Sequence, residues 1–160
     1  MSGTLEGTST LVRLVVRRDR VRLALWVVVL VVLMAYSAVQ VHDLYRTPEA
    51  LAGYASTVSD NPALVVFAGP GYGLDTAPTV GAVLVNETSL WMALGCALMS
   101  VFLVVRHTRA EEELERADLL RSLVVGRHAP LAAVLAVAVA ADLAVVAGST
   151  LCTVAAGFPL

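Results

Sequence analysis

The sequence predicts an all-α integral membrane protein with three transmembrane helices. Of its 160 residues, 58% are hydrophobic and only 15% are charged, with a mean hydropathy of +0.80; a soluble domain carries about 25% charged residues. Residues 23–41, 88–105 and 129–157 contain a single charge between them, and each stretch is long enough to cross about 30 Å of hydrocarbon. They lack the polar stripe of helices in a soluble bundle, so we assign them as spans.

The positions of the arginines predict the orientation of these spans. The chain has no lysine, and its eleven basic residues are all arginine. Five precede the first span, five lie between the second and third spans, and only Arg46 lies between the first and second. Cytoplasmic loops collect basic residues. We therefore expect a multi-pass protein of the plasma (cytoplasmic) membrane with a cytoplasmic N-terminus, an external loop at residues 42–87 and an external C-terminus.

Residues 9–22 predict an amphipathic helix that lies in the headgroup layer before the first span. One helical face carries the arginines at positions 13, 17 and 20, and another carries the apolar residues at positions 11, 12, 15 and 16. Such a pattern suits a helix in the plane of the membrane surface. A plain basic tail that only fixes orientation is the alternative.

The external loop contains one recognisable helix start. Thr47 is placed to cap a helix that begins at Pro48 and runs to about Val58. Residues 60–62 (Asp-Asn-Pro) and the glycine-rich residues 69–73 are interpreted as chain breakers. The sequence Asn-Glu-Thr at residues 86–88 matches a glycosylation signal. We attribute that match to chance, because it adjoins a span.

A charged block between the second and third spans predicts a cytoplasmic amphipathic helix at residues 108–125. Thr108 and Glu111 have the spacing of a capping box, Glu112 and Arg116 form a favourable i,i+4 pair, and Gly126 is placed to end the helix. The face expected to contact a partner consists of Leu114, Ala117, Leu120, Arg121 and Val124. This pattern fits a connecting helix on the membrane surface or a docking helix for a cytoplasmic protein.

The third span carries two features of interest. Small residues recur at every fourth position and predict a face for close helix packing; they are Ala132, Ala136, Ala140, Ala144 and Gly148. Asp142 is the one charge well inside a span. No basic residue lies at a matching depth in the other spans, so a hydrogen bond to another helix is favoured over a proton relay.

The sequence predicts no catalytic, cofactor or metal site, and no nucleic-acid partner. His42 is expected outside the cell and His107 and His128 inside, so one chain cannot assemble three histidines around a metal. A chain without lysine has no Walker A loop. If ATP powers the protein, another polypeptide must bind the nucleotide.

Several motifs resemble the permease subunits of bacterial ABC-2 type exporters, and most closely the tetronasin or polyketide-antibiotic exporter group. They are Arg-Arg-Asp-Arg at residues 17–20, Asn-Pro at 61–62, Gly-Pro at 69–70 and Arg-His-Thr-Arg-Ala-Glu-Glu-Glu at 106–113. The resemblance implies a permease that exports hydrophobic compounds and pairs with a separate ABC ATPase. It also implies that residues 108–125 are a coupling helix resting on that ATPase.

Members of that group are several times longer and have more spans. The chain is therefore expected to be a truncated product, a fragment, or a split subunit that needs the remaining permease helices or a second permease chain. The alternative function is a small, non-transporting membrane anchor or regulator that binds a cytoplasmic partner through the same amphipathic helix.

Overall fold

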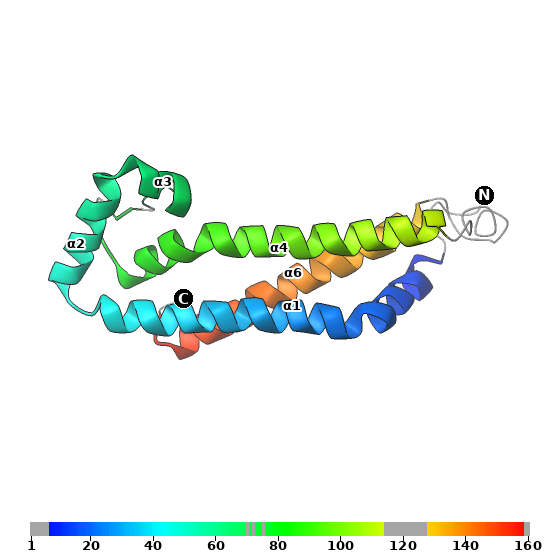
Figure 1. Cartoon of the computed structure of the whole chain (residues 1–160). Coiled ribbons are helices and arrows are strands. Elements are labelled where there is room, and N and C mark those ends of the chain that lie inside the picture. The colour runs from blue at the N-terminus through cyan, green and yellow to red at the C-terminus, as the bar shows by residue number, and fades with distance from the viewer. Residues whose placement is uncertain (1–6, 70, 72, 75, 114–127, 159–160) are drawn as a thin grey trace. The chain divides into compact units, whose positions relative to one another are not determined.

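The computed structural model describes residues 7–69, 71, 73, 74, 76–113 and 128–158. These residues form five helices and no strand (Figure 1): α1 (Thr8–Leu44), α2 (Pro48–Ser59), α3 (Pro62–Ala68), α4 (Val80–Glu113) and α6 (Ala129–Ala155). Of these, α1, α4 and α6 are long and apolar enough to cross a membrane. The predicted all-α membrane fold with three spans is confirmed.

The chain divides into two compact units. The arginine-rich unit comprises Met1–Val28 and Cys96–Ala144, and the loop unit comprises Val29–Gly95 and Val145–Leu160. Each of the three long helices contributes residues to both units, and each unit has its own buried apolar cluster. The cluster of the arginine-rich unit lies between the long helices, whereas that of the loop unit also includes residues of α2 and of segments outside helices.

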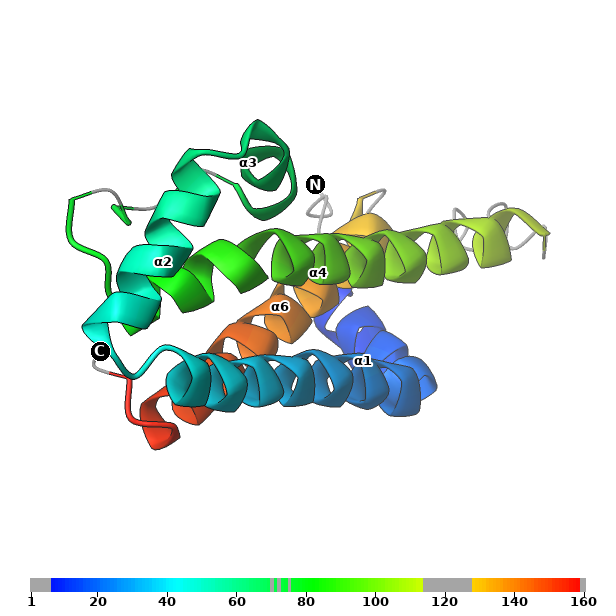
Figure 2. The same ribbon diagram turned by 60° about the vertical axis from the view of Figure 1, so that its left-hand side comes forward.

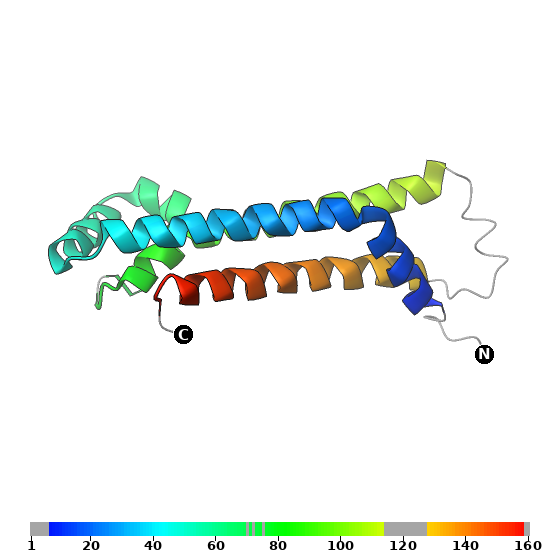
Figure 3. The same ribbon diagram turned by 90° about the horizontal axis from the view of Figure 1, so that it is seen from below.

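In the arginine-rich unit, buried side chains of α1, α4 and α6 meet; they are Val15, Leu103, Val134, Val137 and Ala138. The first turns of α1 bend away from the rest of that helix (Figure 3). The arginines at positions 13, 17, 18 and 20 are exposed there, whereas Val15 is buried. Val16 is 44% exposed, and the placement of this amphipathic segment in the headgroup layer stays a prediction.

The core of the loop unit joins α1, α2 and α4 with two segments outside helices. Its buried residues are Ala38, Val41, Ala55, Leu74, Val83, Leu84 and Phe158. Figure 2 shows α2 and α3 beside the first turns of α4. The predicted start of α2 is confirmed, because the Thr47 hydroxyl accepts a hydrogen bond from the Ala50 amide at 3.3 Å and Pro48 is the first helical residue.

Helix α3 was not predicted, and the interpretation of residues 60–62 as breakers was incomplete. The Asn61 side chain accepts a hydrogen bond from the Ala63 amide at 3.0 Å, and Pro62 is the first helical residue. These are the same two start signals that identify α2. Gly69 ends α3 with a φ of 85°, a conformation that favours glycine.

The long helices extend beyond the assigned spans. Helix α1 continues to Leu44, and α4 begins at Val80 and runs without a break to Glu113. The predicted capping box at Thr108 is therefore wrong. Its hydroxyl instead donates to the carbonyl oxygens of Val104 and Val105, each at 3.1 Å, a bond that lets threonine remain inside a helix. Neither glycine nor proline interrupts residues 96–113.

Two glycines allow close approach of helices in the loop unit. A Cβ atom added to Gly148 of α6 would lie 2.7 Å from Val31 Cγ2 of α1, and one added to Gly95 of α4 would lie 2.6 Å from Leu30 Cδ2. Valine is stiff about χ1, so the Gly148 contact has little room to relax. These glycines set the distance between α1 and its two neighbours in this unit.

We predict that Gly148→Leu destabilises the protein by about 1–3 kcal/mol, because the new side chain overpacks the contact with Val31. Ala147→Leu adds a similar volume at an exposed position of α6 and should change stability little. Thermal unfolding of both variants in detergent micelles, followed by circular dichroism, provides the measurement. Equal melting temperatures for the two variants would contradict the close approach.

Candidate functional site

The most unusual polar feature is a buried carboxylate in the arginine-rich unit. Asp19 of α1 is only 2% exposed although arginines surround it in the sequence. Its Oδ2 lies 2.6 Å from His107 Nε2, and its Oδ1 lies 3.3 Å from Arg106 Nε and 3.9 Å from Arg22 Nη1. We call Asp19, Arg22, Arg106 and His107 the Asp19 cluster.

The Asp19 cluster joins two helices by charge. Arg22 lies one turn after Asp19 on α1, whereas Arg106 and His107 are adjacent residues of α4. An isolated carboxylate in an apolar interior is very costly, and nearby cations and hydrogen bonds offset that cost. Asp19 therefore holds the beginning of α1 against the second half of α4.

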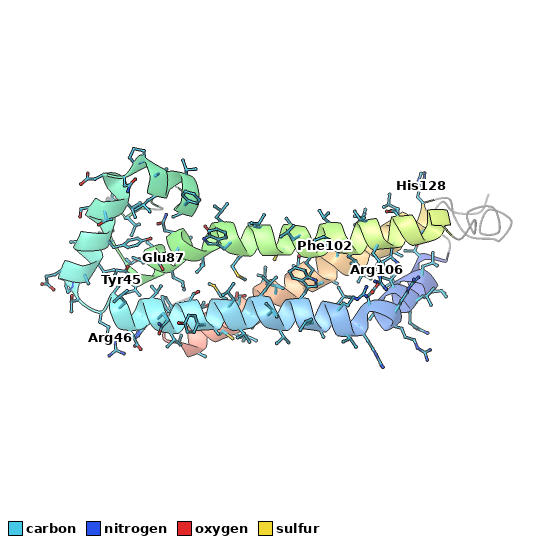
Figure 4. The ribbon with its side chains drawn as sticks, in the orientation of Figure 1. Tyr45, Arg46, Glu87, Phe102, Arg106 and His128 are labelled. Carbon is cyan, nitrogen blue, oxygen red and sulfur yellow. The ribbon has the colours of Figure 1, made fainter. Side chains whose placement is uncertain are left out.

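A small cavity lies beside the Asp19 cluster. Its volume is about 70 Å³, and it is lined by Asp19, Arg22, Leu23, Trp26, Met99, Phe102, Leu103 and Arg106. Figure 4 shows Phe102 and Arg106 projecting from α4 toward α1. The rings of Trp26 and Phe102 are 6.2 Å apart between centroids and inclined by 33°. The cavity thus has one charged wall and one apolar, aromatic wall.

Asp142 also contacts another helix. Ser100 of α4 donates a hydrogen bond from its hydroxyl to Asp142 Oδ2 of α6 at 3.0 Å. The other carboxylate oxygen, Oδ1, is buried. A hydrogen bond to another helix is what the sequence favours for Asp142, and the preference for this role over a proton relay stays a prediction.

Asn86 is the polar centre of the loop unit. It is completely buried, its Oδ1 accepts a hydrogen bond from the Tyr54 hydroxyl at 2.8 Å, and its Nδ2 donates to the carbonyl oxygens of Ala68 and Gly69 at 3.2 and 3.3 Å. One side chain of α4 therefore fixes both α2 and the end of α3. An asparagine enclosed in this way cannot carry a glycan in this fold.

Two tyrosines and a carboxylate lie next to Asn86 in the loop unit. The rings of Tyr45 and Tyr54 meet edge to face, 5.1 Å apart between centroids, and Figure 4 shows Tyr45 near Glu87. Burial raises the pKa of both hydroxyls above the ordinary value, and the negative charge of Glu87 raises it further. Both phenols therefore stay protonated at neutral pH, so Tyr54 remains a hydrogen-bond donor to Asn86.

The predicted site residues have different outcomes. The five expected contacts with an ATPase, at positions 114, 117, 120, 121 and 124, lie outside the described residues. Among the small residues of α6, those at 136, 140 and 144 are exposed, the one at 132 is partly buried, and Gly148 packs on Val31. The buried side of α6 instead includes Ala133, Val137 and Ala141. Packing of another helix on the exposed small residues stays a prediction.

The Asp19 cluster was missed in the sequence. The available signal was one acidic residue among the arginines at 17, 18, 20 and 22, in a segment otherwise suited to the membrane surface. His107 directly follows Arg106 at the end of the second predicted span. No local sequence pattern indicates that these two segments meet, because their contact depends on how α1 packs against α4.

Comparison with known proteins gives one informative similarity. No family model matches the chain. Over 140 residues the chain is 39% identical to a multidrug efflux system permease protein of Mycobacterium tuberculosis. The similar region covers 86% of this chain and 24% of that protein, so the chain spans about a quarter of the length of the curated relative it matches.

We predict that Asp19→Ala destabilises the protein by roughly 3 kcal/mol, because it leaves Arg106 without its counter-charge and His107 without its hydrogen-bond partner. Asp43→Ala is the matched control: Asp43 is 54% exposed, and its partner Arg46 is 63% exposed. Removing that exposed pair should cost less than about 1 kcal/mol. Chemical denaturation in micelles measures both variants, and equal losses would contradict a structural role for the buried carboxylate.

Proposed function

We propose that this chain is the N-terminal, membrane-spanning part of the permease of an ABC exporter that moves hydrophobic compounds, such as polyketide antibiotics, out of the cell. The observation that carries the proposal is the 39% identity to a multidrug efflux system permease protein. Three helices long enough to cross a membrane support it. The name of that relative supports efflux in general, and the polyketide substrate class rests on the resemblance of the motifs at 17–20 and 106–113.

Apolar residues exposed on the long helices support assembly with further helices or with lipid. Large exposed hydrophobic side chains occur along α1, α4 and α6; examples are Leu25, Val32, Phe102, Val139 and Leu143. The exposed alanines of α6 at 136, 140 and 144 have small side chains, which let the backbone of another helix approach closely. In this proposal, the remaining permease helices or a second permease chain pack there.

Energy for export comes, in this proposal, from a separate ABC ATPase that docks on residues 108–125. The uninterrupted helix α4 carries the second span directly into the first part of this segment, up to Glu113. Because a continuous helix bends little, a displacement at the docking segment would be transmitted along α4. The Asp19 cluster would pass the same displacement to the beginning of α1, since Arg106 and His107 lie near that end of α4.

The proposed orientation places the arginine-rich ends of the helices in the cytoplasm. Exposed arginines at positions 13, 17, 18, 20 and 22 of α1 support this placement, because basic residues flank the cytoplasmic ends of spans. Residues 42–87, which include α2 and α3, are then external, as is the C-terminus. An ATPase can reach the docking segment only in this orientation.

We predict that Leu114→Asp combined with Leu120→Asp abolishes co-purification of an ATP-hydrolysing partner, because unpaired charge enters an apolar contact. The measurement is purification of the chain from its native membrane in mild detergent, followed by an ATPase assay of the bound proteins. Membrane levels of the variants are matched before purification. The unaltered chain should retain the ATPase.

A variant that exchanges Glu112 and Arg116 is the control, because the sequence predicts that they form an exposed helical pair, and such a pair contributes only about 0.3–0.5 kcal/mol. It should co-purify the ATPase as well as the unaltered chain does. Undiminished ATPase recovery with the double aspartate variant would contradict docking at this face. Absence of ATPase from the unaltered chain would favour a small membrane anchor or regulator.

A further inference from the structure

The cavity beside the Asp19 cluster has an excess of positive charge. Arg22 and Arg106 face one carboxylate, that of Asp19. Arg22 is 60% exposed and Arg106 is 38% exposed, so both guanidinium groups can reach a further acceptor. A guanidinium has five N–H donors in a planar fork, and this geometry matches the oxygens of a phosphate. The charged wall therefore favours an anion with several oxygens.

The opposite wall of the cavity is apolar and lies on the same two helices. Leu23 and Trp26 come from α1, and Met99 and Phe102 come from α4. Phe102 is 56% exposed, so this wall continues onto the outer surface of the arginine-rich unit. A molecule bound here would have an anionic end between the arginines and an apolar end along the aromatic rings.

The size of the cavity limits what can enter. Its volume of about 70 Å³ is several times the roughly 10–15 Å³ that a cavity needs in order to hold one water molecule. Drug-sized ligands fill pockets of about 300–1,000 Å³, so this cavity is too small for an exported compound. It suits a single small anionic group whose attached chain stays outside.

We propose that this cavity binds the phosphate head group of an anionic phospholipid, with an acyl chain lying along Trp26 and Phe102. The surroundings favour a lipid. Tryptophan and arginine together mark the level where head groups meet hydrocarbon, and the exposed arginines at 17 and 18 add attraction toward an anionic membrane surface. A bound lipid would complete the charge balance of the Asp19 cluster. This site is independent of the proposed export function.

Tryptophan fluorescence offers a direct test, because the chain has only two tryptophans, Trp26 and Trp91. In a Trp91→Phe background, Trp26 is the sole reporter. The chain is placed in phosphatidylcholine bilayers, and phosphatidylglycerol or phosphatidylcholine with brominated acyl chains is added as quencher. We expect brominated phosphatidylglycerol to reach half-maximal quenching at about fivefold lower mole fraction, the factor that one basic contact with an anionic lipid provides.

Arg22→Gln should remove this preference and leave the fold intact, because Arg22 is largely exposed and lies 3.9 Å from Asp19. Arg18→Gln is the matched control. It removes one positive charge from an exposed position of the same helix, but residue 18 lines no part of the cavity. It should retain most of the preference, because it removes only the weaker attraction outside the cavity. Circular dichroism checks the helical content of both variants.

A second reporter and a soluble competitor complete the test. In a Trp26→Phe background, Trp91 of the loop unit should show no preference between the two brominated lipids. Equal quenching of Trp26 by both lipids would overturn the proposal. Equal loss of preference in Arg18→Gln and Arg22→Gln would overturn it as well. The overall positive charge of this part of α1, and not the cavity, would then account for the preference for phosphatidylglycerol. Loss of the preference on addition of glycerol phosphate would assign the site to a free phosphate ester and also overturn the lipid.

Discussion

The carboxylate of Asp19 lies buried between two helices although its partner His107 is 88 positions further along the sequence. Removing a charge from water is tolerated only where other charges or donors replace the water, so α1 can pack here only in the register that brings His107 and Arg106 to Asp19. That constraint fixes how the amphipathic beginning of α1 meets the second half of α4. The cavity lined by Asp19 and Arg106 and the proposed route of motion from an ATPase both depend on it.

The loop unit holds its helices together through a buried polar side chain that carries no charge. Asn86 is fully buried and uses its amide to hold Tyr54 and the carbonyl oxygens at the end of α3. A neutral network costs less to bury than an ionic one, and close packing at Gly95 and Gly148 adds contacts between helices. An ionic cluster in one unit and a neutral network in the other therefore position the helices, while most of the remaining surface of α1, α4 and α6 is apolar.

Local signals in the sequence predicted much of the fold. Uncharged length predicted the three membrane helices, and Thr47 with Pro48 predicted α2 and its cap. The same logic applied to Asn61 with Pro62 and was overlooked because a short polar run before proline also marks a turn. Thr108 failed as a cap because no glycine or proline stops α4, and its hydroxyl can bond to a carbonyl of the preceding turn. The Asp19 cluster could not be predicted, since an acid among arginines shows no partner until the helices are packed.

A double-mutant cycle between Asp19 and His107 tests most directly whether the buried contact between these two side chains holds α1 to α4. The unfolding free energies of Asp19→Leu, His107→Leu and the double variant are measured by reversible denaturation in micelles. If the pair holds the helices, the double variant loses about 1–3 kcal/mol less stability than the sum of the single losses, because the second leucine removes the buried polar group that the first left without its partner. Additive losses would contradict a direct interaction and would leave the register of α1 without its main determinant.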